Sequence, residues 1–181
     1  MTQEELVKEL SKPEVLYAAL GLIVIRIIIW LLFANTIRRT LNLIAVENRL
    51  MTPNQSWLVA VPLVNIYWNF QVASRLRDSL INEFYDRKIA VEENPTFRKG
   101  SLYAWIYLAT NIPLPISISG VLVIMHFVTL ANYWFNISAN RRILEEHDKF
   151  REKEVIINDE NQSSYSIPGA AGSIGFAGIL R

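Results

Sequence analysis

Charged residues are absent from long stretches of this chain, and this distribution constrains its fold more than any other feature. No Asp, Glu, Lys or Arg occurs in residues 50–74 or 100–140, and residues 15–37 contain only Arg26. A bilayer enforces such a separation, because charge is costly in its hydrocarbon core and is tolerated in water. With 51% hydrophobic and 19% charged residues, we expect an integral membrane protein. A soluble globule, a disordered chain and a disulfide scaffold are excluded.

The composition also limits the partners and cofactors. The formal net charge is +1, whereas nucleic-acid binding requires a strong basic excess. The absence of cysteine excludes disulfides, iron–sulfur clusters and thiolate metal sites. His126 and His147 are separated by about a membrane thickness along a helix, so they cannot share a metal ion. We therefore expect no nucleic acid, no cofactor and no metal, and the lipid bilayer as the first partner.

The apolar stretches predict helices that cross the bilayer. The first, residues 15–37, follows an acidic segment without the basic start of a secretory signal, so we expect it to be retained. A second span is predicted at 57–74, with Pro62 inside it. Residues 100–140 as one helix would be about 60 Å long, twice the hydrocarbon thickness. Asn111, Pro113 and Pro115 predict that this stretch folds back as a hairpin.

The chain is thus expected to be an all-α integral membrane bundle of about four spans with amphipathic cytoplasmic extensions. Residues 39–51 fit either a short helix on the membrane surface or a continuation of the first span. A helical extension of the second span is predicted to about Ala90. The expected organisation is an acidic N-terminal segment (1–14), a transmembrane domain (15–140, spans at about 15–37, 57–74, 101–113 and 117–139), a charged cytoplasmic helix (141–155), and a polar, glycine-rich tail (156–181) that begins as a linker.

Lys and Arg near the span ends predict the orientation. Four spans with both termini in the cytoplasm place thirteen basic residues inside and three outside, namely Arg38, Arg39 and Arg49. A rival topology has the Pro62 segment dip into the membrane and return. That topology brings the three arginines to the inner side and gives fourteen inside against two outside. Four full spans are preferred because eighteen apolar-leaning residues suffice to cross.

Arg26 is the residue most suggestive of function, because it lies in the middle of the first span. Ionisable residues inside the membrane are expensive and are by default candidates for a functional site. No Asp or Glu occurs in any predicted span to pair with it. Its partner could be an amide of this chain, a lipid phosphate, an anionic substrate or an acid of another subunit. The structural alternative is that Arg26 leans toward the interface or pairs with amides.

Other polar residues in the spans are candidates for the same site. Asn65 and Asn69 are one turn apart, as are Asn132 and Asn136, so each pair shares a helix face. Such amides commonly hold helices together in lipid, and they could also line a polar cavity with Arg26. A neutral, hydrogen-bonded role is expected for His126. The candidate intramembrane polar or anion site is Arg26, Asn65, Asn69, His126 and Asn132, and the expected interfacial anchors are Arg38, Arg39, Trp57, Trp105 and Trp134.

Residues 51–84, from Pro53 and Trp57 through Pro62 and Asn65 to the helix 72–84, resemble the central part of a family of small polytopic bacterial membrane proteins. That family is classified as a domain of unknown function, with members of this kind in Bacteroidota-like bacteria. The resemblance is plausible to about Arg142 and does not include the last forty residues. It implies a helical bundle in the bacterial inner membrane and no activity or catalytic residue.

The sequence favours a non-catalytic role. We expect an accessory or scaffolding subunit of a larger membrane assembly, with other membrane subunits or further copies of this chain as partners. The alternative is a small transporter or a lipid- or anion-handling protein, with Arg26 as the anion site and anionic lipid among its ligands. No enzyme is expected, because no acid, base and nucleophile are grouped at membrane depth.

Overall fold

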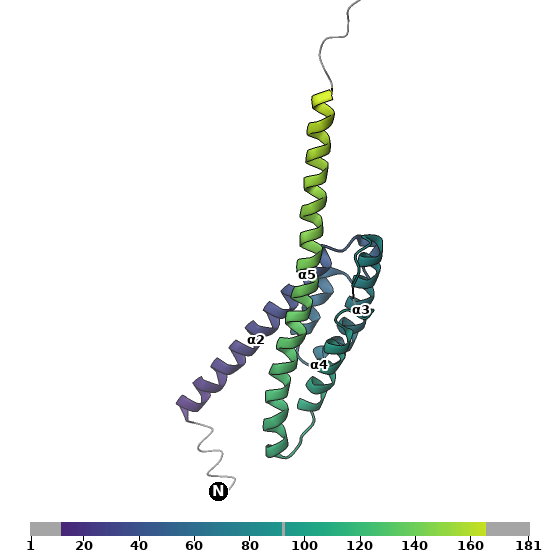
Figure 1. Cartoon of the computed structure of the whole chain (residues 1–181). Coiled ribbons are helices and arrows are strands. Elements are labelled where there is room, and N and C mark those ends of the chain that lie inside the picture. Colours follow the sequence, from purple (N-terminus) through teal and green to yellow (C-terminus); the bar gives the residue numbers. More distant parts are fainter. Residues whose placement is uncertain (1–11, 92, 166–181) are drawn as a thin grey trace, which may run out of the picture. The chain divides into compact units, whose positions relative to one another are not determined.

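The protein is all-helical, and no strand occurs in the part of the chain that the structure describes. The computed structural model describes residues 12–91 and 93–165 (Figure 1). The chain divides into two compact units, Met1–Ile143 and Leu144–Arg181, which we describe separately. The elements are α2 (Pro13–Asn42), η1 (Val46–Asn48), η2 (Pro53–Ala60), α3 (Val64–Asp86), α4 (Phe97–Thr110) and α5 (Ile116–Tyr165), where η denotes a 3-10 helix.

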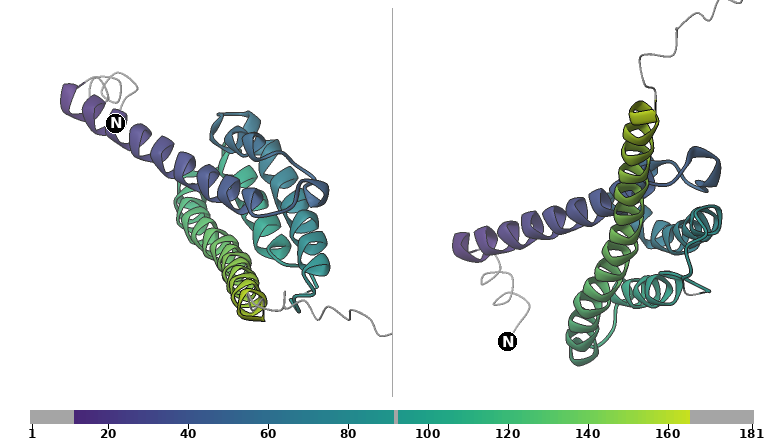
Figure 2. Two further views of the ribbon diagram at one scale, coloured as in Figure 1. Left: turned by 90° about the horizontal axis from the view of Figure 1, so that it is seen from above. Right: turned by 45° about the horizontal axis from the view of Figure 1, so that its top comes forward.

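Two helices, α2 and α5, are long and apolar enough to cross a membrane. α2 begins at Pro13, which suits a first helical turn because its missing N–H would have no partner there, and Lys12 is its N-cap. Only 6% of the most apolar window of α2 and 17% of that of α5 are buried. A core helix of a soluble protein would be mostly buried, so this exposure supports lipid contact. Two views show the N-terminal half of α2 away from α3 and α4 (Figure 2).

The prediction of one continuous helix over 57–74 is wrong, and the four-span bundle is not confirmed. η2 ends at Ala60, and α3 begins at Val64 after a sharp turn at Pro62. Leu63 adopts φ 66° and ψ −47°, and the N–H of Val64 donates to the carbonyl of Pro62 at 2.8 Å. This is a γ-turn with positive φ at its central residue, which is rare and is strained for a residue other than glycine. Pro62 ends the preceding helix because it lacks an N–H donor.

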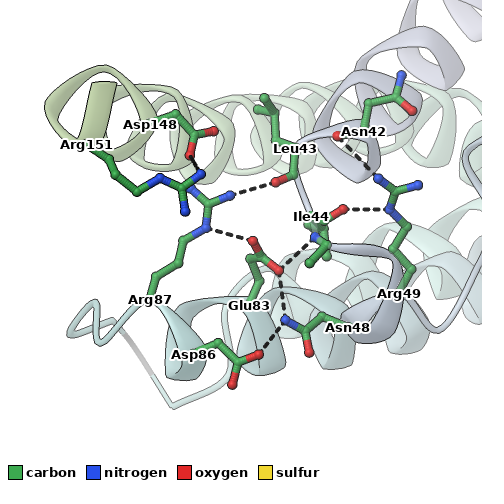
Figure 3. A network of polar contacts seen from close by, with 11 residues as sticks. Asn42, Leu43, Ile44, Asn48, Arg49, Glu83, Asp86, Arg87, Asp148 and Arg151 are labelled. Atoms are coloured by element: carbon green, nitrogen blue, oxygen red, sulfur yellow. Dashed lines mark hydrogen bonds and ion pairs between the residues drawn. The ribbon is translucent and has the colours of Figure 1, made fainter. Parts of the chain in front are cut away.

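The loop after α2 is joined to the C-terminal end of α3 by a buried carboxylate. Glu83, 3% exposed, accepts hydrogen bonds from the backbone N–H of Ala45 and from the Asn48 amide, both at 2.9 Å. Arg87 donates to Glu83 at 2.7 Å and to the carbonyl of Leu43 at 2.8 Å (Figure 3). We call Leu43, Ala45, Asn48, Glu83 and Arg87 the Glu83 network. It places the C-terminal ends of α2 and α3 on one side of the unit.

The pKa of Glu83 reflects competition between burial and hydrogen bonding. Burial by itself raises the pKa of this carboxyl, because it disfavours the charged form. The hydrogen bonds from Asn48, the backbone of Ala45 and Arg87, together with the charge of Arg87, outweigh that effect. The pKa of Glu83 is therefore held below its ordinary value of 4.5. The sequence predicts the favourable pairing of Glu83 with Arg87, which the structure confirms, but the contacts with residues 43–48 are apparent only in the fold.

Aromatic side chains form the core where α2, α4 and the first part of α5 meet. Phe33 is fully buried and lies 5.9 Å from Tyr103, 5.7 Å from Tyr133 and 5.7 Å from Trp134 between ring centroids. Gly100 makes this packing possible, because a Cβ atom there would lie 2.7 Å from the Cζ of Tyr133. The hairpin predicted at Asn111–Pro115 is confirmed, since α4 ends at Thr110 and α5 starts at Ile116.

The described residues of the second unit continue α5 as a charged helix. An exposed ion pair between Asp148 and Arg151, 3.9 Å apart, contributes little to stability. The polar linker expected from residue 156 is not observed, because the helix continues to Tyr165. The glycine-rich part of the predicted tail, 166–181, lies outside the described residues, as does most of the acidic segment 1–14.

Candidate functional site

A cavity of about 200 Å³ in the first unit is lined in part by Arg26, which is exposed. We call it the Arg26 cavity. Arg26, Ile29 and Trp30 come from α2, and Thr110 and Asn111 come from the C-terminal end of α4. The remaining lining residues, Val123, His126, Phe127 and Leu130, come from α5. One cationic group and a few polar groups thus face a mainly apolar enclosure, as is typical of small-ligand sites.

Arg26 has a partner in this chain, although that partner is not an acid. Its guanidinium lies 4.4 Å from the centroid of the Trp30 ring, one helical turn further along α2. A cation over an indole face is stabilised by about 0.5–2 kcal/mol, depending on desolvation. Thr110 and Asn111 mark the C-terminal end of α4, where the helix dipole places partial negative charge. These two features and the exposure of the residue explain how the arginine is tolerated among apolar residues.

His126 forms the buried side of the Arg26 cavity. The residue is 7% exposed, and its ring lies 5.3 Å from Tyr107 and 5.5 Å from Tyr103. These aromatic neighbours fix the plane of the imidazole. Its Nδ1 atom is buried without a hydrogen-bond partner. A buried polar atom without a partner costs about 1–3 kcal/mol.

The structure divides the predicted polar site. Arg26 and His126 line one cavity, whereas Asn65 and Asn69 are buried on α3 and do not line it. Asn69 lies beside Tyr103, and Asn65 is 1% exposed. Asn132 is exposed on α5 and is absent from the cavity lining. Of the five residues expected to share one site, only Arg26 and His126 line the Arg26 cavity.

The predicted interfacial anchors also occupy different environments. Arg38 lies over the ring of Trp57, with 5.9 Å between its guanidinium carbon and the ring centroid, and Arg39 is exposed. Trp105 is 61% exposed and packs its edge against Phe70, an environment that suits an anchor. Trp134 instead donates a hydrogen bond from its indole nitrogen to the hydroxyl of Thr36 at 2.9 Å. Trp134 therefore links α5 to α2.

Sequence reasoning missed Thr110 and Asn111 as site residues. Asn111 is recognised from the sequence only as a helix breaker. In the structure its side-chain amide and the Thr110 hydroxyl both donate to the carbonyl of Tyr107, each at 2.7 Å. Their oxygen atoms remain available as acceptors near Arg26. The sequence did contain a signal for these two residues, because they end a helix that is shorter than the bilayer is thick. Broken helices often mark binding sites in membranes.

Comparison with known proteins adds no family assignment. No protein-family model, no curated protein and no solved structure matches this chain. The resemblance of residues 51–84 therefore stays a prediction. Among the residues that the structure describes, no group of three or more His, Asp or Glu side chains is arranged to hold a metal ion.

Proposed function

We propose that this chain is a non-catalytic, multi-pass membrane protein that binds an anionic group in the Arg26 cavity. The observation that carries the proposal is one cavity lined by Arg26 and His126, with no Asp or Glu in the described lining to pair with the arginine. We also propose a topology of three crossings, by α2, α4 and α5, in which the Pro62 segment dips into the membrane and returns. The resemblance of residues 51–84 favours the inner membrane of a bacterium as the location.

The Glu83 network supports this topology. Four full spans require the loop after α2 and the C-terminal end of α3 to lie on opposite sides of the membrane. Glu83 instead bonds Ala45 and Asn48 directly, so both segments belong to one side. The chain between Arg49 and Arg75 must then leave that side and return to it. The count of basic residues agrees, with fourteen on this side and two on the other, and favours an N-terminus outside and a C-terminus inside.

The turn at Pro62 is suited to a lipid environment. Irregular backbone is tolerated at membrane depth only where its polar groups are satisfied. The carbonyls of Val61, Pro62 and Leu63 accept hydrogen bonds from Asn65, Val64 and Ile66, respectively, at 2.8–3.3 Å. Apolar side chains surround the turn, and Leu63 is 81% exposed. An exposed leucine on a turn whose carbonyls are satisfied supports contact of this turn with the membrane near its surface, where water reaches the rest of the backbone.

Thiol labelling distinguishes the two topologies, because the native chain has no cysteine. Single cysteines at the exposed positions Glu47, Lys88 and Ser117 are treated with a membrane-impermeant maleimide in right-side-out and inverted vesicles. We expect Glu47→Cys and Lys88→Cys to react from the same, cytoplasmic side and Ser117→Cys from the opposite side. Four spans predict that Glu47→Cys reacts from the side of Ser117→Cys. Reaction of Glu47→Cys and Lys88→Cys from opposite sides contradicts the proposed topology.

Binding at Arg26 can be followed through the neighbouring indole. Purified protein in nanodiscs of zwitterionic lipid is titrated with acetate, inorganic phosphate, a long-chain carboxylate and a lysophosphatidate, and the Trp30 emission is isolated by subtracting a Trp30→Phe variant. We expect a saturable change with at least one of these anions. Replacement of the charge in Arg26→Gln should weaken binding about tenfold or more, because charge-assisted hydrogen bonds contribute about 1.5–3 kcal/mol.

The matched control is Arg39→Gln, which removes an exposed arginine from the same helix and should leave the response unchanged. If no anion in the panel gives a saturable response in the native protein, the proposed binding function is wrong. Equal responses from native protein and Arg26→Gln also contradict it.

The accessory-subunit function is a second candidate, and the N-terminal half of α2 favours it. Leu16, Tyr17, Leu22, Ile23 and Val24 are all at least half exposed, and Gly21 has open space around it. A helix of another subunit could pack there, since small residues allow close approach in membranes. Gentle extraction followed by identification of co-purifying proteins tests this function, and purification of the chain alone from every detergent counts against it.

A further inference from the structure

We infer that the ligand of the Arg26 cavity is a single-chain amphiphile with an acidic head, and that it enters sideways from the bilayer. This inference rests on the proposed function, because it names the class of anion that the site would hold. A fatty acid and a lysophosphatidate share this chemistry. The argument depends on the size of the cavity, on where it opens, and on the depth of Arg26.

The cavity is too small to enclose a whole ligand of ordinary size. Its volume of about 200 Å³ is below the range of roughly 300–1,000 Å³ that is usual for pockets that bury a drug-sized molecule. It is large enough for an acidic head and the first part of a chain. The rest of any larger ligand must lie outside, over the surface beside the cavity.

The surface beside the cavity is apolar and exposed. Val123 and Phe127 line the cavity and are 48% and 47% exposed, and the neighbouring Ile25 on α2 is 55% exposed. The buried side holds His126, and the described lining contains no Asp or Glu. Arg26 is itself exposed, so a cation lies beside exposed apolar side chains, with Trp30, His126 and Leu130 buried behind them. A cation next to apolar surface matches the two ends of an acidic amphiphile. An acyl chain on the rim would cover surface that already faces lipid.

The depth of the site favours an amphiphile over a free inorganic anion. Arg26 lies near the middle of α2, and His126 lies ten residues, or about 15 Å, along α5 from its start at Ile116. A hydrated anion would lose its water to reach such a site through lipid, which is very costly. An amphiphile already resides in the bilayer, so its chain stays in lipid and only its head has to move inward to reach the guanidinium. The head then gains the N–H donors of Arg26.

Depth-dependent quenching tests the inference in the full chain. Stearic acids that carry a doxyl group at carbon 5, 12 or 16 are added to protein in zwitterionic nanodiscs, and quenching of Trp30 is measured by difference against Trp30→Phe. A phosphatidylcholine with the same doxyl positions reports the depth of Trp30 itself. If the carboxylate is held at Arg26, carbon 5 lies beside Trp30. Among the three doxyl acids, we therefore expect the 5-doxyl acid to quench Trp30 most. Among the three doxyl phospholipids, we expect those with the deeper doxyl groups to quench Trp30 most.

Competition and variants complete the test. Unlabelled stearate should restore the Trp30 emission, and Arg26→Gln should return the acid series to the order seen with the phospholipid. Because Arg26→Gln could fail to fold, the reversed quenching order in the native protein stands as an independent measurement. A lysophosphatidate competitor at least tenfold stronger than stearate identifies a phosphate head, and the converse identifies a carboxylate.

The outcomes separate this inference from the proposed function. If acetate or phosphate binds at Arg26 and no amphiphile competes, the anion site exists and the inference is wrong. If the acid and the phospholipid quench in the same order in native protein, the inference is also wrong. If neither small anions nor amphiphiles change the Trp30 emission, both are wrong.

Discussion

Glu83→Ala is expected to lower the free energy of unfolding by about 3–5 kcal/mol, because removing one partner of a buried ion pair leaves the other uncompensated. Arg87 would lose its carboxylate, and the Asn48 amide and the N–H of Ala45 would each lose an acceptor. The measurement is reversible unfolding in mixed micelles, followed by circular dichroism. The control is Asp78→Asn, which breaks the more exposed pair with Arg77 and should cost less than about 1 kcal/mol.

The same network predicts how stability depends on pH. The pKa of Glu83 is lowered in the fold, so its contribution is fully present above the ordinary pKa of 4.5 and is lost as pH falls through the lower folded value. Native protein should therefore lose stability below about pH 4.5, and Glu83→Gln should lack this component. The gap between the two proteins should narrow as the pH falls. A constant gap between pH 7 and pH 3 would contradict the role assigned to the Glu83 carboxylate.

Phe33→Ala is expected to produce a loss of similar size, about 3–5 kcal/mol, because it opens a cavity among Tyr103, Tyr133 and Trp134. In a bilayer the transfer of apolar surface from water contributes little between helices, so the loss is mainly one of van der Waals contact. The same unfolding measurement applies.

Leu32→Ala is the matched control for Phe33→Ala, because Leu32 is the preceding residue and is 52% exposed. Its loss should stay near 0.5 kcal/mol. Equal losses at both positions would show that α2 does not pack through the Phe33 face. A smaller Phe33→Ala effect accompanied by tighter anion binding would show instead that the new space is joined to the Arg26 cavity.

Helices were predictable from the sequence where the composition and length of one segment are enough to define them. Residues 15–37 form part of α2, and the hairpin at 111–115 follows from prolines and from a block too long for one crossing. The helix over 57–74 was not predictable in the same way. Its apolar composition suits a span, and Pro62 alone does not distinguish a kinked helix from a complete break. The γ-turn at Leu63 is compatible with the fold because η2 packs on both α2 and α3.

The residues of the candidate site were likewise predictable from the sequence only in part. The sequence identified Arg26 and His126 individually, because a charge and an imidazole are unusual among apolar residues. It could not exclude Asn132, since helical spacing shows which residues share a face but not what that face contacts. Thr110 and Asn111 could be recognised as site residues only after α4 was seen to end beside Arg26.

By itself, the sequence determined that the chain is helical, that two of its segments suit lipid, and that one arginine lies among them without an acid nearby in the chain. These properties depend on local composition and on the cost of placing charge in hydrocarbon. Only the tertiary structure decided that Glu83 joins the loop after α2 to the end of α3, and that Arg26 faces His126 across a small cavity. Contacts between residues 35 to 100 positions apart depend on how side chains of different helices pack, and no local pattern encodes them.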